Sequence, residues 1–217
     1  MYNGQDLRGW KGLVANPVKR RQLSADTLAL LQVKADEIMR SGWEAKGEEL
    51  HFTGHGDNLC SVKDYQDFEM YVDWKIEKDG DAGLYLRGSP QVQIWDHTNE
   101  KDFKHGCQKG SGGLWNNSPG KPGKDPLVLA DKPAGEWNHC QITCCGPKID
   151  VVLNGQPVTS FDMTLWRSGT ENPDGSKMPP WLNKPLSSHP TKGAIGLQGK
   201  HGGAPIWFRN IKIKPLG

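Results

Sequence analysis

A nine-residue run at positions 68–76 alternates between apolar and polar side chains. Its apolar members occupy every second position and are Phe68, Met70, Val72, Trp74 and Ile76. Because successive side chains of a β-strand point to opposite faces, this period of two predicts a strand with one face in a core. The chain of 217 residues also holds 27 glycines, 15 prolines and nine tryptophans, which favours a turn-rich all-β protein.

Two further runs repeat the alternation after turns at positions 79–80 and 88–90, with Leu84 and Ile94 among their core positions. We predict that the three strands are neighbours and share one outward face. The side chains expected on it combine charged groups, amides and aromatic rings, and they are Tyr71, Asp73, Tyr85, Arg87, Gln91, Gln93 and Trp95. Polar groups bind sugar hydroxyls and aromatic rings stack on pyranoses, so this face predicts a carbohydrate site. The alternative is an ordinary solvated face.

The charge balance indicates no polyanionic partner. Charged residues make up 24% of the chain and the net charge is +2, which argues against nucleic acid and anionic membranes. No apolar run reaches about 18 residues, so we expect no membrane insertion.

The five cysteines lack the spacing of a zinc site. Cys140 and Cys144 are expected to be buried reduced thiols, with one disulfide as the alternative.

Residues 23–40 form the one convincing helix, with Ser24 as its N-cap. Asn154-Gly155 predicts a hairpin with a type I′ turn. Further strands are expected at residues 43–45, 49–52, 59–62, 127–129, 137–145, 148–153, 156–161, 194–198 and 206–213. This pattern predicts one domain over residues 1–217, an all-β, two-sheet antiparallel jelly-roll sandwich with one N-terminal helix. Segments 99–124 and 166–190 are long and irregular, and we expect the first to border the site.

Several short motifs, ordered along nearly the whole chain, resemble a known family. They are Tyr2-Asn3-Gly4-Gln5-Asp6-Leu7-Arg8-Gly9-Trp10, Asp67-Phe68-Glu69-Met70, Gly83-Leu84-Tyr85-Leu86-Arg87, Val92-Gln93-Ile94-Trp95-Asp96, Gly113-Leu114-Trp115, Glu136-Trp137-Asn138, Leu153-Asn154-Gly155, Gly196-Leu197-Gln198, His201-Gly202 and Phe208-Arg209-Asn210-Ile211. The chain resembles the DUF1080, or 3-keto-disaccharide hydrolase, family of bacterial carbohydrate-utilisation proteins. That resemblance implies a concanavalin-like sandwich.

The resemblance also implies an enzyme that cleaves glycosides oxidised at C3, by proton abstraction and elimination followed by addition of water. The candidates for the acid and base are Asp73, Asp96 and His201. The candidates for holding substrate are Tyr71, Tyr85, Arg87, Gln91, Gln93, Trp95, Trp115 and Arg209. Two positions depart from the family, since Gln91 stands where Glu is usual and Trp115 where Tyr is usual. Gln91 cannot ionise, and a retaining double displacement, which needs two carboxylates, is therefore disfavoured.

Each charged candidate also has a structural interpretation. The alternatives are an ion pair of Asp73 with Lys75 or Arg87, a turn capped by Asp96, a solvated His201 in the glycine-rich turn 199–203, and a carboxylate held by Arg209.

No metal site or cofactor is predicted. Ca²⁺ at Asp96 is the alternative, although no Asp-rich calcium loop is present. The expected partner is an oligosaccharide or glycoside substrate. Two other classes of function stay open, a non-catalytic carbohydrate-binding module and a structural interaction domain. The first four residues contain no signal-peptide core, and we expect a periplasmic or secreted protein whose leader is absent from this sequence.

Overall fold

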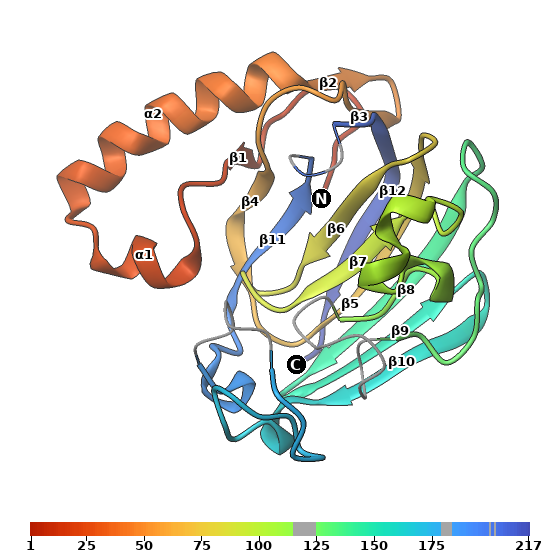
Figure 1. Cartoon of the computed structure of the whole chain (residues 1–217). Coiled ribbons are helices and arrows are strands. Elements are labelled where there is room, and N and C mark those ends of the chain that lie inside the picture. Colours follow the sequence, from red (N-terminus) through yellow and green to blue (C-terminus); the bar gives the residue numbers. More distant parts are fainter. Residues whose placement is uncertain (115–124, 179–183, 200, 202) are drawn as a thin grey trace.

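The computed structural model describes residues 1–114, 125–178, 184–199, 201 and 203–217. It contains two antiparallel sheets packed face to face (Figure 1). The five-stranded sheet runs in the order β1 (Trp10–Gly12), β4 (Leu59–Tyr65), β11 (Gly193–Gln198), β6 (Asp81–Tyr85) and β7 (Gln91–Trp95). The seven-stranded sheet runs in the order β10 (Gln156–Asp162), β9 (Lys148–Leu153), β8 (Asn138–Cys145), β5 (Phe68–Ile76), β12 (Ile206–Pro215), β3 (Glu49–Phe52) and β2 (Trp43–Lys46). The predicted fold class, an all-β two-sheet jelly-roll sandwich, is confirmed.

The core lies between the two sheets, as the alternation predicts. All five apolar positions of β5 are buried, from Phe68 at 0% exposure to Ile76 at 2%. The inward positions of the opposite sheet, including Leu84 and Leu197, are also fully buried. Cys140 and Cys144 lie in this core as free thiols, and burial raises the pKa of each to about 12. They are therefore packing residues that stay neutral.

The prediction that the three central strands are neighbours is correct for β6 and β7 and wrong for β5. β5 pairs with β8 and β12, whereas β6 pairs with β11 and β7 in the other sheet. The Asp79-Gly80 turn therefore carries the chain from one sheet to the other and does not close a hairpin. An Asp-Gly pair suits both connections, because each needs a residue with positive φ, and Asp79 has φ +61°. The predicted polar face is split between the two outer faces of the sandwich.

The predicted helix is confirmed as α2 (Ala25–Gly42), and Ser24 caps it by accepting a 3.2 Å hydrogen bond from the Thr27 N–H. A second short helix, α1 (Pro17–Gln22), precedes it. Both helices project from one side of the sandwich, beside β1 and β4 (Figure 1). Among the described residues, no helix has the length and apolar character needed to cross a membrane.

The predicted hairpin is confirmed as β9 and β10, with φ +49° at Asn154 and +81° at Gly155. Residues 127–129, predicted as a strand, form no strand. Their three side chains are exposed, and the Leu127 N–H bonds to the Val158 carbonyl oxygen at 2.8 Å without extending into a ladder. The remaining regular elements are short 3₁₀ turns at Glu100–His105, Cys107–Lys109, Met163–Leu165 and Leu186–Ser188.

Candidate functional site

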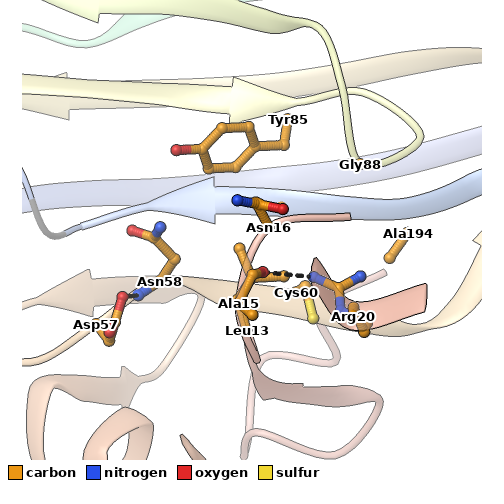
Figure 2. A pocket seen from close by; sticks show the side chains of 11 residues that line it. Leu13, Ala15, Asn16, Arg20, Asp57, Asn58, Cys60, Tyr85, Gly88 and Ala194 are labelled. Atoms are coloured by element: carbon orange, nitrogen blue, oxygen red, sulfur yellow. Dashed lines mark hydrogen bonds between the residues drawn. The ribbon is translucent and has the colours of Figure 1, made fainter. Parts of the chain in front are cut away.

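A pocket of about 260 Å³ opens on the outer face of the five-stranded sheet (Figure 2). Cys60, Gly196 and Tyr85 lie in one cross-strand row at its base, because Gly196 pairs with both of the others. The lining comes from four separate segments, residues 13–20, 57–60, 85–88 and 194–196. The site therefore combines positions that are far apart in the sequence.

Tyr85 is the aromatic side chain that lines this pocket. Its ring packs against Gly196, where an added Cβ would lie 2.9 Å from Tyr85 Cδ2. A glycine at this position therefore makes room for the ring. Burial, with Asp81 and Asp57 nearby, raises the pKa of Tyr85 to about 12, and a hydrogen bond with Asn58 offsets only part of this. Tyr85 is consequently a neutral hydroxyl at physiological pH and cannot act as a base there.

A chain of buried amides stands behind Tyr85. Gln93 donates from Nε2 to Asp81 Oδ1 at 2.6 Å. Gln91 donates from Nε2 to Gln93 Oε1 at 3.0 Å and to Gln198 Oε1 at 2.7 Å. Gln198 in turn donates from Nε2 to the Tyr85 hydroxyl at 3.1 Å. Gln91 and Gln93 are only 5% and 2% exposed and do not line the pocket, and they lie beside Tyr85 on the same face of the sheet.

Asp57 and Asn58 form another side of the pocket, in the loop between β3 and β4. Asp57 supplies the carboxylate of the described lining. Asn58 is 8% exposed, and its Oδ1 accepts a 3.1 Å hydrogen bond from the Gly199 N–H. This bond places the start of the glycine-rich turn 199–203 beside the pocket. His201 lies in that turn as an exposed residue, and it is not part of the described lining.

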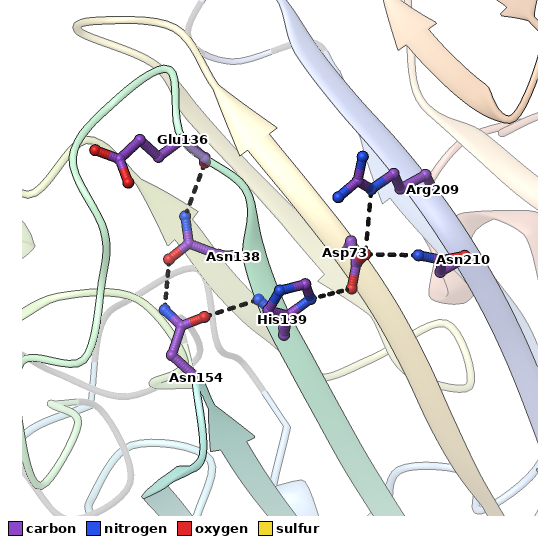
Figure 3. Close-up of polar contacts among 7 residues, drawn as sticks. All are labelled: Asp73, Glu136, Asn138, His139, Asn154, Arg209 and Asn210. Atoms are coloured by element: carbon purple, nitrogen blue, oxygen red, sulfur yellow. Dashed lines mark hydrogen bonds and ion pairs between the residues drawn. The ribbon is translucent and has the colours of Figure 1, made fainter.

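Asp73 lies on the outer face of the other sheet (Figure 3). Its carboxylate contacts His139 Nδ1 at 2.7 Å, Asn210 Nδ2 at 2.7 Å and Arg209 Nε at 3.2 Å. Burial alone would raise the pKa of Asp73, but these contacts outweigh it and hold the pKa below its ordinary value. Asn210 has φ +52° at an irregularity in the β5–β12 register, so Asp73 stabilises this bulge. The alternative interpretation of Arg209, that it holds a carboxylate, matches this contact.

Two more candidates are tied into backbone turns. Arg87, with φ +54°, is buried and donates from Nη1 to the carbonyl oxygens of Gly146 at 2.8 Å and Thr191 at 3.3 Å. Asp96 accepts from the Asp79 N–H at 3.0 Å and from the Thr98 N–H at 2.9 Å. Burial alone would raise the pKa of Asp96, but these bonds lower it overall. The turn-capping alternative for Asp96 matches these contacts.

The aromatic candidates are dispersed. Trp95 is 4% exposed and donates from Nε1 to the Gly110 carbonyl oxygen at 2.8 Å, so its polar atom is used internally. Tyr71 is 42% exposed on the outer face of the seven-stranded sheet, near Asp73. Trp115 lies outside the described residues. The prediction that Asp73, Arg87, Gln93, Asp96 and His201 surround one cavity is therefore wrong, because the first lies on the opposite face of the sandwich.

Segment 99–124 was expected to border the site, and its described part, residues 99–114, contributes nothing to the pocket lining. Within the described part of the chain, no group of three or more His, Cys, Asp or Glu side chains is placed to hold a metal ion. The alternative of Ca²⁺ at Asp96 therefore has no cluster of ligands among these residues.

The sequence interpretation missed most of the pocket wall. Asp57 and Asn58 follow Gly54-His55-Gly56, a polar turn directly before a strand, and this placement was an available signal. Asn16 and Arg20 gave no such signal, because they reach the pocket only through the path of the chain before α2. Cys60 also lines the pocket, and burial raises the pKa of its thiol above the ordinary value.

Comparisons with known proteins cover nearly the whole chain. A curated relative from Bacteroides thetaiotaomicron, named 3-keto-disaccharide hydrolase, is 24% identical over 100% of this chain and 77% of its own length. A solved structure from Parabacteroides distasonis, described as a candidate glycosyl hydrolase, is 37% identical with a TM-score of 0.67, covering 81% of this chain and 91% of that one. A second structure from that organism, of the same description, shares the fold at 23% identity and a TM-score of 0.63, covering 100% and 92% of the two chains. The family described as 3-keto-alpha-glucoside-1,2-lyase-like domain matches residues 1–214, and the chain belongs to this family.

Proposed function

We propose that this chain is a carbohydrate-active enzyme that cleaves the glycosidic bond of 3-keto glycosides in the Tyr85 pocket. The observation that carries the proposal is a protonated hydroxyl and a carboxylate, Tyr85 and Asp57, lining one pocket. The family and the name of the curated relative support the substrate class. A periplasmic or secreted location stays a prediction.

The chemistry requires a base, a donor to a developing negative charge and an acid. A carbonyl at C3 acidifies the hydrogen on C2, so a base removes that proton and the electron pair moves to the C3 oxygen as an enolate. When the carbonyl re-forms, a C1–C2 double bond forms and the glycosidic oxygen leaves C1 with a proton from an acid. Water then adds across the double bond, so the complete reaction is a hydrolysis.

In this proposal Asp57 removes the C2 proton and Tyr85 donates a hydrogen bond to the C3 oxygen. The Gln198 amide uses a lone pair of the Tyr85 oxygen, so this bond does not consume the hydroxyl proton. A donor that is already oriented stabilises a developing oxyanion without reorganisation during the reaction. His201 is assigned the acid role, since its turn contacts Asn58 through Gly199.

The direct test is incubation with 3-keto-trehalose and measurement of released sugar. Asp57→Asn and Tyr85→Phe should each lower turnover by about a hundred- to a thousandfold. Matched controls are Asp150→Asn, an exposed carboxylate on β9, and Tyr65→Phe, a tyrosine on β4 away from the pocket. The proposed enzymatic function would be rejected if wild-type protein released no sugar. It would also be rejected if Asp57→Asn and Tyr85→Phe both released sugar at the wild-type rate.

A non-catalytic carbohydrate-binding module is the second candidate, and Gln91 favours it. Its neutral amide is built into the buried amide chain at the position where the family resemblance leads us to expect a glutamate. Calorimetry with intact glycosides separates the two functions. A module binds them without releasing sugar, and Asp57→Asn then weakens binding only modestly.

A further inference from the structure

The pocket owes one of its walls to a segment that is not part of either sheet. Leu13, Ala15, Asn16 and Arg20 line this side, while β4, β6 and β11 provide the base. Without this segment the outer face of the five-stranded sheet would continue openly toward β4 and β1. We infer that residues 13–20 form a specificity wall that limits the site to one sugar residue and the linkage next to it. This inference rests on the proposed function.

The wall is folded back on itself by Arg20 (Figure 2). The guanidinium donates from Nε to the Val14 carbonyl oxygen at 2.8 Å and from Nη2 to the Ala15 carbonyl oxygen at 3.0 Å. Ala15 has φ +49°, a conformation that a non-glycine residue keeps only when its surroundings fix it. The Leu13 N–H bonds to the Asn58 carbonyl oxygen at 3.0 Å, which ties the wall to the opposite side of the pocket.

Helix α2 braces the start of the wall. Asp36 Oδ1 accepts from the Gly12 N–H at 2.8 Å, and Gln32 Nε2 donates to the Gly12 carbonyl oxygen at 2.9 Å. Gln32 also donates to Asp36 Oδ1 at 2.7 Å, so both side chains are fixed. Gly12 touches the Ala35 backbone so closely that a side chain there would collide.

This bracing explains a helix that otherwise adds little to the core. The buried residues of α2 are Met39 and Gly42, in its last turn, whereas Leu30 is 71% and Val33 59% exposed. Most of the helix therefore contributes little apolar burial to the sandwich, and its specific polar contacts go to Gly12. We assign Asp36 and Gln32 as positioning residues that act through the wall.

The size of the pocket fits this assignment. Its volume of about 260 Å³ lies just below the range of about 300–1,000 Å³ that is usual for drug-sized ligands. Residues 13–20 occupy one side of the pocket, so a glycan that extended in that direction would meet them. The expected ligand is consequently the end of a short glycoside and not the interior of a polysaccharide.

The test compares glucosides of one, two and four sugar residues, each oxidised at C3 of the terminal glucose. Wild type should favour the disaccharide over the tetrasaccharide in kcat/KM. Arg20→Ala and Asp36→Ala should each reduce this preference by about three- to tenfold, the factor expected for the loss of one or two hydrogen bonds. For Asp36→Ala the change should lie in KM, because Asp36 touches no pocket surface. Lys34→Ala, an exposed neighbour on α2, is the matched control and should behave as wild type.

The possible failures are distinguishable. The specificity wall would be overturned if wild type cleaved or bound the tetrasaccharide with the same efficiency as the disaccharide. It would also be overturned if both variants kept the wild-type preference for the disaccharide. Gln32→Ala replaces Asp36→Ala if thermal melting shows that the latter does not fold. If wild type neither binds nor cleaves any of the three glucosides, the proposed function fails, and the inference fails with it.

Discussion

Gln198 donates a 3.1 Å hydrogen bond from Nε2 to the hydroxyl of Tyr85. The two residues lie on the adjacent strands β11 and β6, so the contact joins neighbouring strands on the face that carries the pocket. It makes the hydroxyl oxygen an acceptor toward Gln198, so this bond does not use the hydroxyl proton. The direction of this bond underlies the role that we propose for Tyr85.

Replacing Tyr85 by Phe should affect stability as well as turnover. Gln198 Nε2 would lose its acceptor in a buried site, which typically costs about 1–3 kcal/mol in unfolding free energy. Denaturant unfolding measures this loss, and Tyr65→Phe is the matched control. An unchanged unfolding free energy for Tyr85→Phe would contradict the buried contact.

Tyr85 should also cause a loss of stability at alkaline pH. Its pKa is raised to about 12 in the folded protein, against about 10 in the unfolded chain. Between these values the unfolded state binds fewer protons than the folded state, so stability falls as pH rises from about 10 to about 12. Thermal melts across this range should show a steeper decline for wild type than for Tyr85→Phe. Parallel declines would contradict the raised pKa.

Asp73→Asn should lower stability through the β5–β12 bulge. The carboxylate has three polar partners, and losing its charge weakens the contacts with Arg209 and Asn210 by about 1–3 kcal/mol together. Because the pKa of Asp73 is lowered on folding, its contribution is complete above the unfolded value of about 4 and is lost as pH falls below it. Urea titrations at neutral and acidic pH should therefore show a gap between wild type and variant that closes in acid. Asp150→Asn should show no gap.

Gln91→Glu tests the buried amide chain. An ionised carboxylate cannot donate to Gln93 or Gln198, so both bonds are lost, whereas a protonated carboxyl has one O–H and restores one of them. The pKa of the new carboxyl group would be raised on folding, so the loss of stability grows by about 1–3 kcal/mol as pH rises above the unfolded value of about 4.3 and is smallest below it. Melting at neutral and acidic pH measures this, with Gln141→Glu on the other sheet as control. If the difference in stability between wild type and Gln91→Glu were the same at neutral and acidic pH, it would argue against the buried amide hydrogen bonds.

Local features of the fold could be read from the sequence, and long-range ones could not. The alternation in residues 68–76 and the Asn154-Gly155 turn depend on neighbouring residues, so β5 and the β9–β10 hairpin were predicted correctly. Which sheet a strand joins depends on distant partners, and the Asp79-Gly80 turn carries no information about them. This one error grouped Asp73 with Tyr85, although the two residues lie on different sheets.

Only the part of the candidate site that lies on neighbouring strands could be predicted from the sequence. Tyr85, Gln91 and Gln93 lie on adjacent strands of one sheet, so their alternation was enough to group them. Asp57 and Arg20 approach Tyr85 only because β4 pairs with β11 and because the segment before α2 lines the same pocket. Hydrophobic periodicity describes faces within an element and is silent on such approaches.

The apolar layer between the two sheets also separates two polar surfaces, one around Tyr85 and one around Asp73. Groups so far apart, with no shared partner, usually contribute independently to the free energy of folding. A lineage carrying this scaffold can thus vary the surface around Asp73, within the limits of stability, without altering the catalytic chemistry proposed for the opposite side.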